Sequence, residues 1–385
     1  MAESNLTVGA GHPVFSRFIV TSNRGSHRYA QDELRKLCPG VTFTELEPEE
    51  VQLAVFPRAA EEVLAAVREN EPVFIRHLHP VTAILDMPSS PLSGIEGNSE
   101  PDNGQEQEEE EQASAEQTVL LAEQIFAQVE AGIAANVKAA VQLRKSSGVE
   151  PAVPLGGLRE ALEQLLMQHQ GAQIAVQEAE AVISVFITQT QLYTGCSRTA
   201  DNLSDWAGGA VRFRREEGQV SRAKFKLLEA ESRFGLDFSL VHKALDIGAA
   251  PGGWTSLLLE RGAQVTAVDP GELHPSLRRH PKLTMLRKNA ADVRFRDNEF
   301  DLLVCDMSWS PKQMVRLVRE LLYALCPGGT AIITLKLMHG KPFQTLKDAI
   351  RAFSPLLEFA HAKQLFHNRD ELTLHMVRTG EQAQE

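Results

Sequence analysis

The segment from Leu245 to Ser256, LDIGAAPGGWTS, constrains the fold of this chain more than any other stretch. A short apolar run delivers Asp246 and Gly248 to its end, a glycine-rich turn follows, and a helix is expected to begin near Thr255. Glycine allows positive φ and lets a backbone pass close to a ligand, and ligands bind beyond the carboxyl ends of parallel strands. The segment therefore predicts a nucleotide-type pocket in an α/β sheet.

The pattern around this segment alternates between strands and helices, which is typical of a Rossmann-like, doubly wound α/β sheet. We expect helices at 221–232, 255–261, 313–325 and 343–353, and strands at 244–247, 265–269, 302–306, 331–336, 359–365 and 372–378. A turn is expected at Pro327-Gly328-Gly329. The sequence thus predicts one Rossmann-like domain over 221–385.

The glycine spacing favours a nucleoside cofactor without phosphates. It is not Gly-x-Gly-x-x-Gly, and Pro251 would stiffen the loop where a pyrophosphate requires free N–H groups. S-adenosylmethionine has no phosphates. Asp269 ends the next expected strand, where an acid accepts hydrogen bonds from ribose hydroxyls, and this position supports the same choice.

The first 200 residues are expected to hold two small α+β domains. In 1–85, strands at 17–22, 41–46, 51–56 and 72–75 and helices at 26–37 and 59–69 give the βαββαβ order of a ferredoxin-like domain. In 118–200, we expect helices at 118–143 and 157–168 and strands at 173–178, 181–188 and 192–197. Residues 201–220 are expected to form a connector with a basic face.

Charge is distributed unevenly along the chain. The net charge is −12, and the segment from Glu96 to Glu116 contains nine acidic residues and no Lys or Arg. The Pro-, Ser-, Gly- and Glu-rich segment 86–117 is predicted to be a disordered, solvated linker, with an acidic docking tail as the alternative. Residues 201–385 have a net charge of +3, so this half is free to approach phosphate.

Several other classes of protein are disfavoured. No stretch approaches the roughly 20 apolar residues that cross a bilayer, and the start has no signal-peptide pattern, so we expect a cytoplasmic protein that does not enter a membrane. The cysteines are scattered without a Cys-x-x-Cys pair, and the histidines lack metal-ligand spacing, so neither a disulfide framework nor a metal is expected.

Five motifs together resemble one family of enzymes. DIGAAPGGW, SRAKFKL (221–227), VCDM (304–307), LKL (335–337) and QLFHNRDELTLH (364–375) occur in the order found in the FtsJ-like (RrmJ) ribose 2′-O-methyltransferases. Within that group the chain is most similar to the RlmM family, which modifies a cytidine of 23S rRNA. The resemblance implies S-adenosylmethionine as cofactor and RNA, 23S rRNA or its precursor, as substrate.

The resemblance places the family's catalytic tetrad on Lys226, Asp306, Lys336 and Glu371. A ribose hydroxyl is a poor nucleophile and needs a proton acceptor. Lys336 can accept that proton only if its pKa falls from about 10.4 toward neutrality, through burial or a neighbouring cation, which Lys226 would supply. Asp306 and Glu371 would orient the two ammonium groups, with Asp370 as an alternative to Glu371.

The resemblance also implies a set of cofactor contacts. The adenine contact departs from the family, which usually has an acid there. Asn289 stands at this position and is our preferred residue, with Asp292 as the alternative. The remaining implied contacts are Ser221, Ala250, Pro251, Gly252, Gly253, Trp254, Asp269 and Asp306.

Other methyltransferase chemistries fit less well. Methylation of exocyclic amines typically requires Asn/Asp-Pro-Pro-aromatic where this chain has Asp306-Met307-Ser308-Trp309. Methylation of cytosine C5 requires a nucleophilic cysteine. Cys305 precedes Asp306 in an expected strand and would therefore point to the opposite face, into the core.

RlmM-like proteins carry a ferredoxin-like domain and a THUMP RNA-binding domain before the catalytic one, and residues 183–206 resemble the end of such a unit. The first 200 residues are acidic, which disfavours RNA binding by electrostatic attraction in these two domains. We expect a monomer that methylates RNA. The alternatives are a tRNA ribose methyltransferase and a non-catalytic RNA-binding or ribosome-assembly factor.

Overall fold

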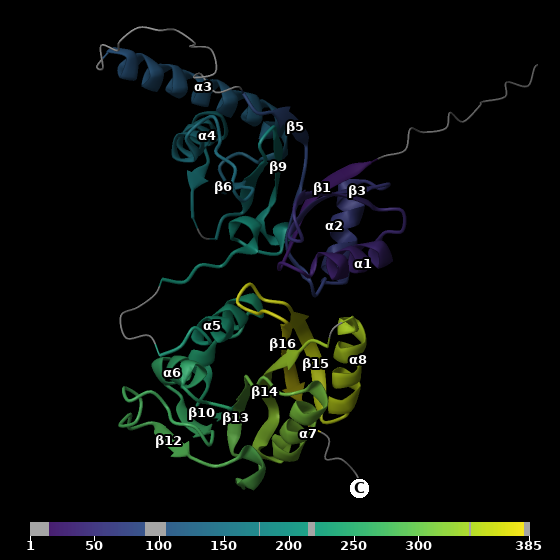
Figure 1. The fold of residues 1–385 in the computed structure, drawn as a ribbon, viewed down its shortest axis with the longest axis vertical. Helices are drawn as coiled ribbons and strands as arrows, with labels where there is room; N and C mark the ends of the chain where they lie inside the picture. Colours follow the sequence, from purple (N-terminus) through teal and green to yellow (C-terminus); the bar gives the residue numbers. More distant parts are fainter. Residues whose placement is uncertain (1–14, 89–104, 177, 215–219, 339, 381–385) are drawn as a thin grey trace, which may run out of the picture. The chain divides into compact units, whose positions relative to one another are not determined.

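The computed structural model describes residues 15–88, 105–176, 178–214, 220–338 and 340–380, with the backbone alone for 105–111. Two compact units make up the chain, Met1–Ala210 and Val211–Glu385. In Figure 1 the first is drawn in purple to teal and the second in green to yellow.

The second unit is built on a seven-stranded sheet with the order β12-β11-β10-β13-β14-β16-β15. Its strands are β10 (Lys243–Ile247), β11 (Gln264–Val268), β12 (Leu283–Leu286), β13 (Phe300–Cys305), β14 (Leu325–Lys336), β15 (Leu357–Lys363) and β16 (Glu371–Arg378). The α/β class predicted from the sequence is confirmed, and β12 is a strand that the prediction missed.

One strand runs against the others: β16 is antiparallel to both β14 and β15. The sheet is therefore mixed rather than wholly parallel. The reason lies in the connection between β15 and β16, which spans only residues 364–370. A parallel crossover requires a dozen or more residues, whereas an antiparallel return does not.

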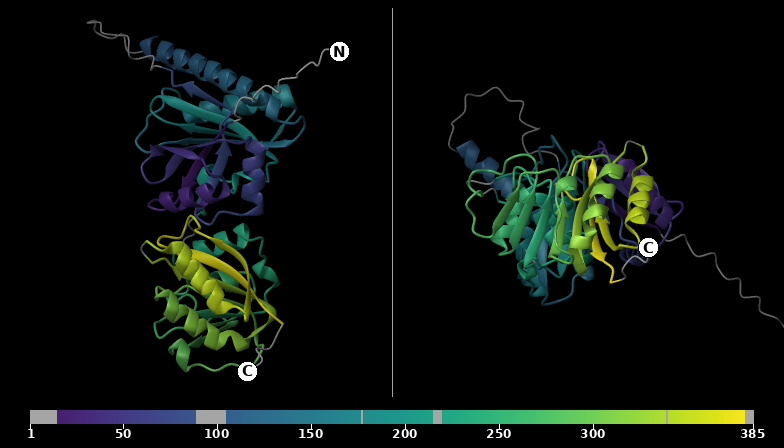
Figure 2. Two further views of the ribbon diagram at one scale, coloured as in Figure 1. Left: turned by 90° about the vertical axis from the view of Figure 1, so that its right-hand side faces the viewer. Right: turned by 90° about the horizontal axis from the view of Figure 1, so that it is seen from below.

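Helices cover both faces of this sheet. Figures 1 and 2 show α5 (Lys224–Arg233) and α6 (Gly253–Glu260) on one face, and α7 (Pro311–Leu321) and α8 (Pro342–Phe353) on the other. Proline occupies the first position of both α7 and α8, where its missing N–H costs nothing. The helix predicted at 313–325 ends at Leu321, and the predicted turn at Pro327 lies within the bounds of β14.

The first unit begins with a four-stranded antiparallel sheet in the order β2-β3-β1-β4. Its elements are β1 (Ser16–Ser22), α1 (His27–Leu37), β2 (Thr42–Glu47), β3 (Val51–Phe56), α2 (Ala60–Glu69) and β4 (Ile75–Pro80). The predicted strand at 72–75 was wrong in position. Pro72 has no N–H for a ladder, and the observed strand contains His77 and His79, buried histidines that a polarity pattern does not assign to a core.

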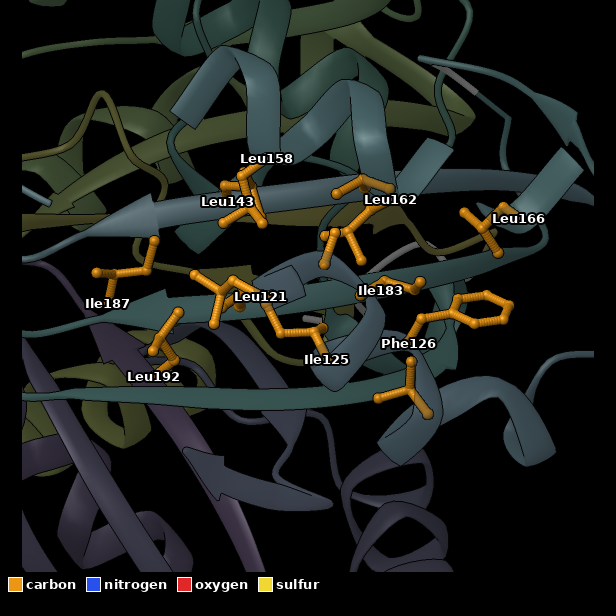
Figure 3. Packing of buried hydrophobic residues seen from close by; sticks show 14 of the residues in the cluster. Leu121, Ile125, Phe126, Leu143, Leu158, Leu162, Leu166, Ile183, Ile187 and Leu192 are labelled. Carbon is orange, nitrogen blue, oxygen red and sulfur yellow. The ribbon is translucent and has the colours of Figure 1, made fainter. Parts of the chain in front are cut away.

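A five-stranded sheet completes this unit in the order β5-β9-β8-β6-β7. Its elements are β5 (Ala83–Asp86), α3 (Gln105–Val129), β6 (Lys138–Lys145), α4 (Leu155–Gln170), β7 (Gln173–Ile174), β8 (Ala181–Ile187) and β9 (Gln191–Arg198). Figure 3 shows Leu158, Leu162 and Leu166 of α4 pointing into a core that also contains Leu121 and Ile125 of α3. Such packing stabilises a helix far more than its propensity does.

Two predictions fail in this region. The helix predicted at 118–143 ends at Val129, and residues 138–145 form a central strand. The predicted disordered linker at 86–117 includes the end of β5 and, from Gln105, the first half of α3. Glu, Gln and Ala are good helix formers, so this composition extends a helix whose later turns are packed. The part at 89–104 lies outside the described residues.

Candidate active site

The glycine-rich loop after β10 has the tight geometry that its sequence predicts. Gly248 and Gly252 have φ of +78° and +111°, values that favour glycine. A Cβ on Gly248 would lie 2.4 Å from Met307 Cγ, and one on Gly252 would lie 2.5 Å from Leu277 Cδ1. Gly248 therefore packs directly against the segment that follows β13, and Gly252 packs against the segment that follows β11, so a side chain at either position would force the loop away from its neighbour.

Asp269, at the end of β11, organises the same loop. Its Oδ2 accepts a hydrogen bond from Ala250 N at 3.1 Å, and its Oδ1 accepts one from Gly271 N at 2.6 Å. Ser221 also lies at this loop, because a Cβ on Gly253 would be 3.0 Å from the Ser221 Cβ. The structure thus brings together the predicted cofactor residues on three segments: Ser221, Ala250 to Gly253, and Asp269.

Trp254, one of the implied cofactor contacts, has its side chain in the core of the second unit. Its indole is only 3% exposed, packs in the core of the second unit and donates from Nε1 to Ala223 O at 2.8 Å. The ring is therefore committed to the core and is not available to stack on a base or on a cofactor. Any contribution of Trp254 to the pocket comes from its backbone.

Asn289 and Asp292 lie side by side, at the edge of a short 3-10 turn after β12. Both are exposed, and Asn289 Nδ2 is 3.4 Å from Asp292 Oδ2. Donation to Asp292 orients the Asn289 amide and turns its oxygen the other way. An oriented amide oxygen is the acceptor that an adenine amino group requires.

Asp246 is a site residue that the predicted list of contacts missed. Its carboxyl is 1% exposed and accepts a hydrogen bond from Thr255 Oγ1 at 2.6 Å. Burial, with additional repulsion from Asp306 and Asp269, raises the pKa of Asp246 to about 7. The pocket edge of the sheet therefore carries three acids within electrostatic reach of one another.

Three of the four predicted tetrad residues are in direct contact. The Lys226 ammonium of α5 lies 3.1 Å from Asp306 Oδ1 and 2.5 Å from Glu371 Oε1, and all three side chains are less than one fifth exposed. Asp306 also accepts from Thr334 Oγ1 at 2.9 Å, a contact that the sequence did not reveal. Burial acts to lower the pKa of Lys226, but the two carboxylates outweigh it and raise that pKa.

Lys336, the fourth residue, ends β14 directly across the ladder from Glu371. Its side chain is exposed, and within the described residues its ammonium has neither a hydrogen bond nor an ion pair. The expected pairing of the acids is found for Lys226 alone, since neither Asp306 nor Glu371 pairs with the Lys336 ammonium in the described part of the chain. The charge of Lys226 is offset by two acids, and Lys336 faces solvent.

The polypeptide path explains why these four residues lie at the same edge of the sheet. Strands β13 and β14 are parallel, so their carboxyl ends lie at the same edge of the sheet. Asp306 directly follows β13, and Lys336 is the last residue of β14. Because β16 is antiparallel, its first residue, Glu371, reaches that edge as well. Helix α5 covers this edge and supplies Lys226 from its first turn.

A hydrogen-bonded loop supports Glu371. Glu229, one turn after Lys226 on α5, is buried and accepts hydrogen bonds from Phe366 N at 2.7 Å and His367 N at 3.0 Å. His367 Nδ1 lies 2.7 Å from Glu229 Oε2. Sequence reasoning missed this pair, although the motif QLFHNRDELTLH contains the histidine.

Other candidates separate clearly by burial. Cys305 is fully buried, and burial raises the pKa of its thiol, which disfavours it as a nucleophile. Trp309 is 44% exposed, so its ring is accessible. In and beside the connector that was expected to have a basic face, Arg212, Arg214 and Arg222 are exposed, whereas Lys224 is buried and paired with Glu260 at 2.7 Å. Arg215 lies outside the described residues.

The described part of the chain has neither a candidate metal site nor a candidate membrane-spanning helix. It contains no group of three or more His, Cys, Asp or Glu placed to hold a metal ion. None of its helices combines the length and the apolar character needed to cross a membrane.

The second unit combines an α/β sheet, a glycine-rich loop and a cluster of acids at the carboxyl edge of its strands, the architecture in which a nucleoside cofactor binds. Residues 219–360 match the family of FtsJ-like methyltransferases, which confirms the resemblance seen in the motifs. Curated relatives match over the C-terminal half of the chain. The ribosomal RNA large subunit methyltransferase M of Halorhodospira halophila is 39% identical over 177 residues, 45% of this chain and 51% of the relative.

The protein of the same name from Laribacter hongkongensis is 36% identical over 186 residues, 45% of this chain and 52% of the relative. The chain spans about half the length of the curated relatives that it matches. Among solved structures, TrmN from Thermus thermophilus aligns over 94% of this chain and 99% of its own. Its TM-score of 0.33 and 16% identity make that likeness too distant to carry an argument.

Proposed function

We propose that this protein transfers a methyl group from S-adenosylmethionine to a ribose 2′-hydroxyl of RNA, and that its substrate is large-subunit ribosomal RNA. The observation that carries the proposal is the meeting of Lys226, Asp306 and Glu371 in one hydrogen-bonded cluster, with Lys336 as the ladder partner of Glu371. The names of the relatives support the substrate class.

The charge of the pocket supports this cofactor. Asp246, Asp269 and Asp306 lie around the glycine-rich loop, so the pocket suits hydroxyl groups and a cation better than phosphates. S-adenosylmethionine, when bound, supplies a methyl group on a positively charged sulfur. Ser221, Ala250, Pro251, Gly252, Gly253 and Asp269 would hold it, with Asn289 at the adenine.

The lysines are assigned different roles. Lys226 stays charged because two carboxylates hold it, so it positions Asp306 and Glu371 rather than accepting a proton. Lys336 is accessible to the incoming ribose and is the proposed proton acceptor. With the ribose at Lys336, the amine of that side chain would take the proton of the 2′-hydroxyl. The oxygen then bonds to the methyl carbon while the carbon–sulfur bond breaks.

The first unit is proposed to bind RNA. Its strand order β2-β3-β1-β4, with two helices in βαββαβ sequence, is that of a ferredoxin-like domain. The second sheet and helices α3 and α4 would form the THUMP-like domain. Because this half of the chain is acidic, we propose that it recognises RNA by shape more than by charge, in a cytoplasmic, monomeric enzyme.

The experiment that tests this proposal is methyl transfer in vitro. The full chain is incubated with tritium-labelled S-adenosylmethionine and total RNA from a strain that lacks the gene, and the labelled RNA is separated by size and digested to nucleosides. We expect label in large-subunit ribosomal RNA as a 2′-O-methylated nucleoside. A synthetic RNA with a single 2′-deoxyribose at the mapped position is the matched control and should accept no label.

Each alternative gives a different result. Label in tRNA preserves the chemistry and overturns the substrate class. Label that persists on the 2′-deoxy control places the methyl group on a base and overturns the 2′-O assignment. Absence of label from every RNA, with the cofactor still bound, favours a non-catalytic RNA-binding or assembly factor.

A further inference from the structure

A groove of about 890 Å³ lies between α7 and α8, on the face of the sheet opposite α5 and α6. Its volume is within the range of ligand pockets, about 300–1,000 Å³. Most of the surface that lines it is apolar, and five of its lining residues have apolar side chains: Pro311, Val315, Met338, Ala349 and Ala352. An apolar hollow of this size on an exposed face is a candidate binding surface.

The groove adjoins the loops that carry the candidate catalytic groups. Ser310, at its edge, follows Asp306 by four residues, and Met338, also at its edge, follows Lys336 by two. Met338, which lines the groove, is 52% exposed, and Trp309, which precedes Ser310 in the chain, is 44% exposed. A chain that places one ribose at Lys336 has the groove within reach of its neighbouring nucleotides.

The charges around the groove favour a polyanion. Four cations line it, Lys312, Arg316, Arg319 and Lys341, against two acids, Glu320 and Asp348. Arg316 is paired with Glu320, and Arg319 donates to Ala352 O. Within the described residues the ammonium groups of Lys312 and Lys341 have no such partner. Two unpaired lysines beside an apolar floor suit phosphates flanking a base.

We propose that this groove binds the single-stranded RNA segment next to the target nucleotide, with a base against the apolar floor and phosphates at Lys312 and Lys341. Single-stranded RNA combines these two features, since its bases stack on apolar or aromatic groups while its backbone follows cations. The inference rests on the proposed function, because it takes the substrate of the same site to be RNA.

The test compares charge reversal inside and outside the groove. The double variant K312E/K341E removes both unpaired cations, and K347E is the matched control on α8, since Lys347 is exposed but does not line the groove. A third variant, A352F, fills the groove without changing charge. For each we measure the Kd for the RNA mapped above over a range of salt, the Kd for S-adenosylmethionine, and kcat and KM.

We expect K312E/K341E to weaken RNA binding at least tenfold and to reduce the slope of log affinity against log salt by about 1.4, since each phosphate contact on a single strand contributes about 0.7. A352F should raise KM for RNA several-fold, while K347E stays within twofold of the wild type. The affinity for S-adenosylmethionine should remain unchanged in all of them, which also shows that the variants fold.

The inference is overturned if K312E/K341E binds RNA like the wild type, or if K347E weakens binding as much as the double variant does. Those outcomes are distinct from failure of the proposed function. If the wild type methylates no RNA, the proposed function fails. If the groove variants methylate RNA normally, only the proposed role of the groove in RNA binding fails. A wild type that binds no RNA overturns both.

Discussion

Lys336 and Glu371 are the last pair of the ladder between β14 and β16. Glu371 in turn contacts Lys226, so Lys336 is connected to the buried cluster through its strand partner rather than by a contact of its own. This relationship separates the four residues into a fixed group of three and one accessible amine. The separation determines what each substitution should do.

Replacing Lys336 with Met should abolish methyl transfer while leaving the cofactor bound. The side chain is exposed and has no partner within the described residues, so its loss should cost little stability. Loss of a general base typically lowers kcat by about 10²- to 10⁴-fold. Single-turnover methyl transfer and a titration with S-adenosylmethionine measure the two effects. Near-normal turnover in K336M would show that another group accepts the proton.

Replacing Lys226 with Met should affect both stability and activity. Asp306 and Glu371 would lose the cation between them and face each other as like charges in a partly buried site. We expect the free energy of unfolding to fall by about 1–3 kcal/mol, since these side chains retain some exposure to solvent. Denaturant unfolding measures the loss.

The double variant K226M/E371Q is the control for K226M, since it removes the cation together with one of its two acids. It should recover part of the stability but not the activity. If K226M unfolds like the wild type, the ion pairs contribute nothing to the folded state.

Much of the secondary structure of the second unit could be predicted from the sequence, because glycine-rich turns and short apolar strands leave local patterns in it. Gly248 and Gly252 adopt positive φ, as the glycine-rich turn predicts, and the strands on both sides of it have the expected bounds within a few residues. The direction of β16 was not predicted from the sequence. The direction of β16 depends on the length of the connection before it and on the strands that it pairs with. The alternation of strands and helices in the sequence predicts neither of these.

The contacts of the site were less accessible to sequence reasoning. Trp254 follows the glycine loop, but whether its ring enters the pocket or the core depends on Ala223, the residue before α5, which accepts the indole hydrogen bond. The motifs located Lys226 and Asp306 but said nothing of Thr334, which is hydrogen-bonded to Asp306 from a neighbouring strand. Such pairs are set by tertiary packing, and a single chain read in order does not display them.

Asp246 should make stability depend on pH. Its pKa is about 7 in the folded protein and about 3.9 when unfolded, so between these values the folded state binds the extra proton. The stabilising contribution is complete below about pH 4 and is lost as pH rises toward 7. The loss is at most about 4 kcal/mol, from 1.36 kcal/mol per pKa unit.

The variant D246N tests this dependence because it cannot ionise. Relative to the wild type, it should gain stability between pH 5 and pH 8 in denaturant unfolding without added cofactor. Equal pH dependence of the two proteins would contradict the assignment to Asp246. Thr255→Val is a useful second variant, since it removes the hydroxyl that stabilises the charged form and should extend the loss of stability to higher pH.

Glu229 should act as a positioning residue for Glu371. Its two oxygens accept backbone hydrogen bonds from Phe366 and His367. In Glu229→Gln an NH₂ group replaces one of these oxygens, so one of the two backbone N–H groups loses its acceptor. The 364–370 loop should loosen, and kcat should fall about tenfold or more while the affinity for S-adenosylmethionine remains. Hydrogen exchange at the amides of Phe366 and His367 measures the loosening directly.

Glu231→Gln provides the matched control on the same helix. Glu231 is also buried and accepts from a backbone amide, that of Phe238, but it pairs with Arg261 and does not touch the loop before β16. It should cost a similar amount of stability, about 1–3 kcal/mol, without a comparable loss of kcat. If both variants lower kcat equally, the effect of Glu229 is only structural, because a general loosening of α5 would then explain both.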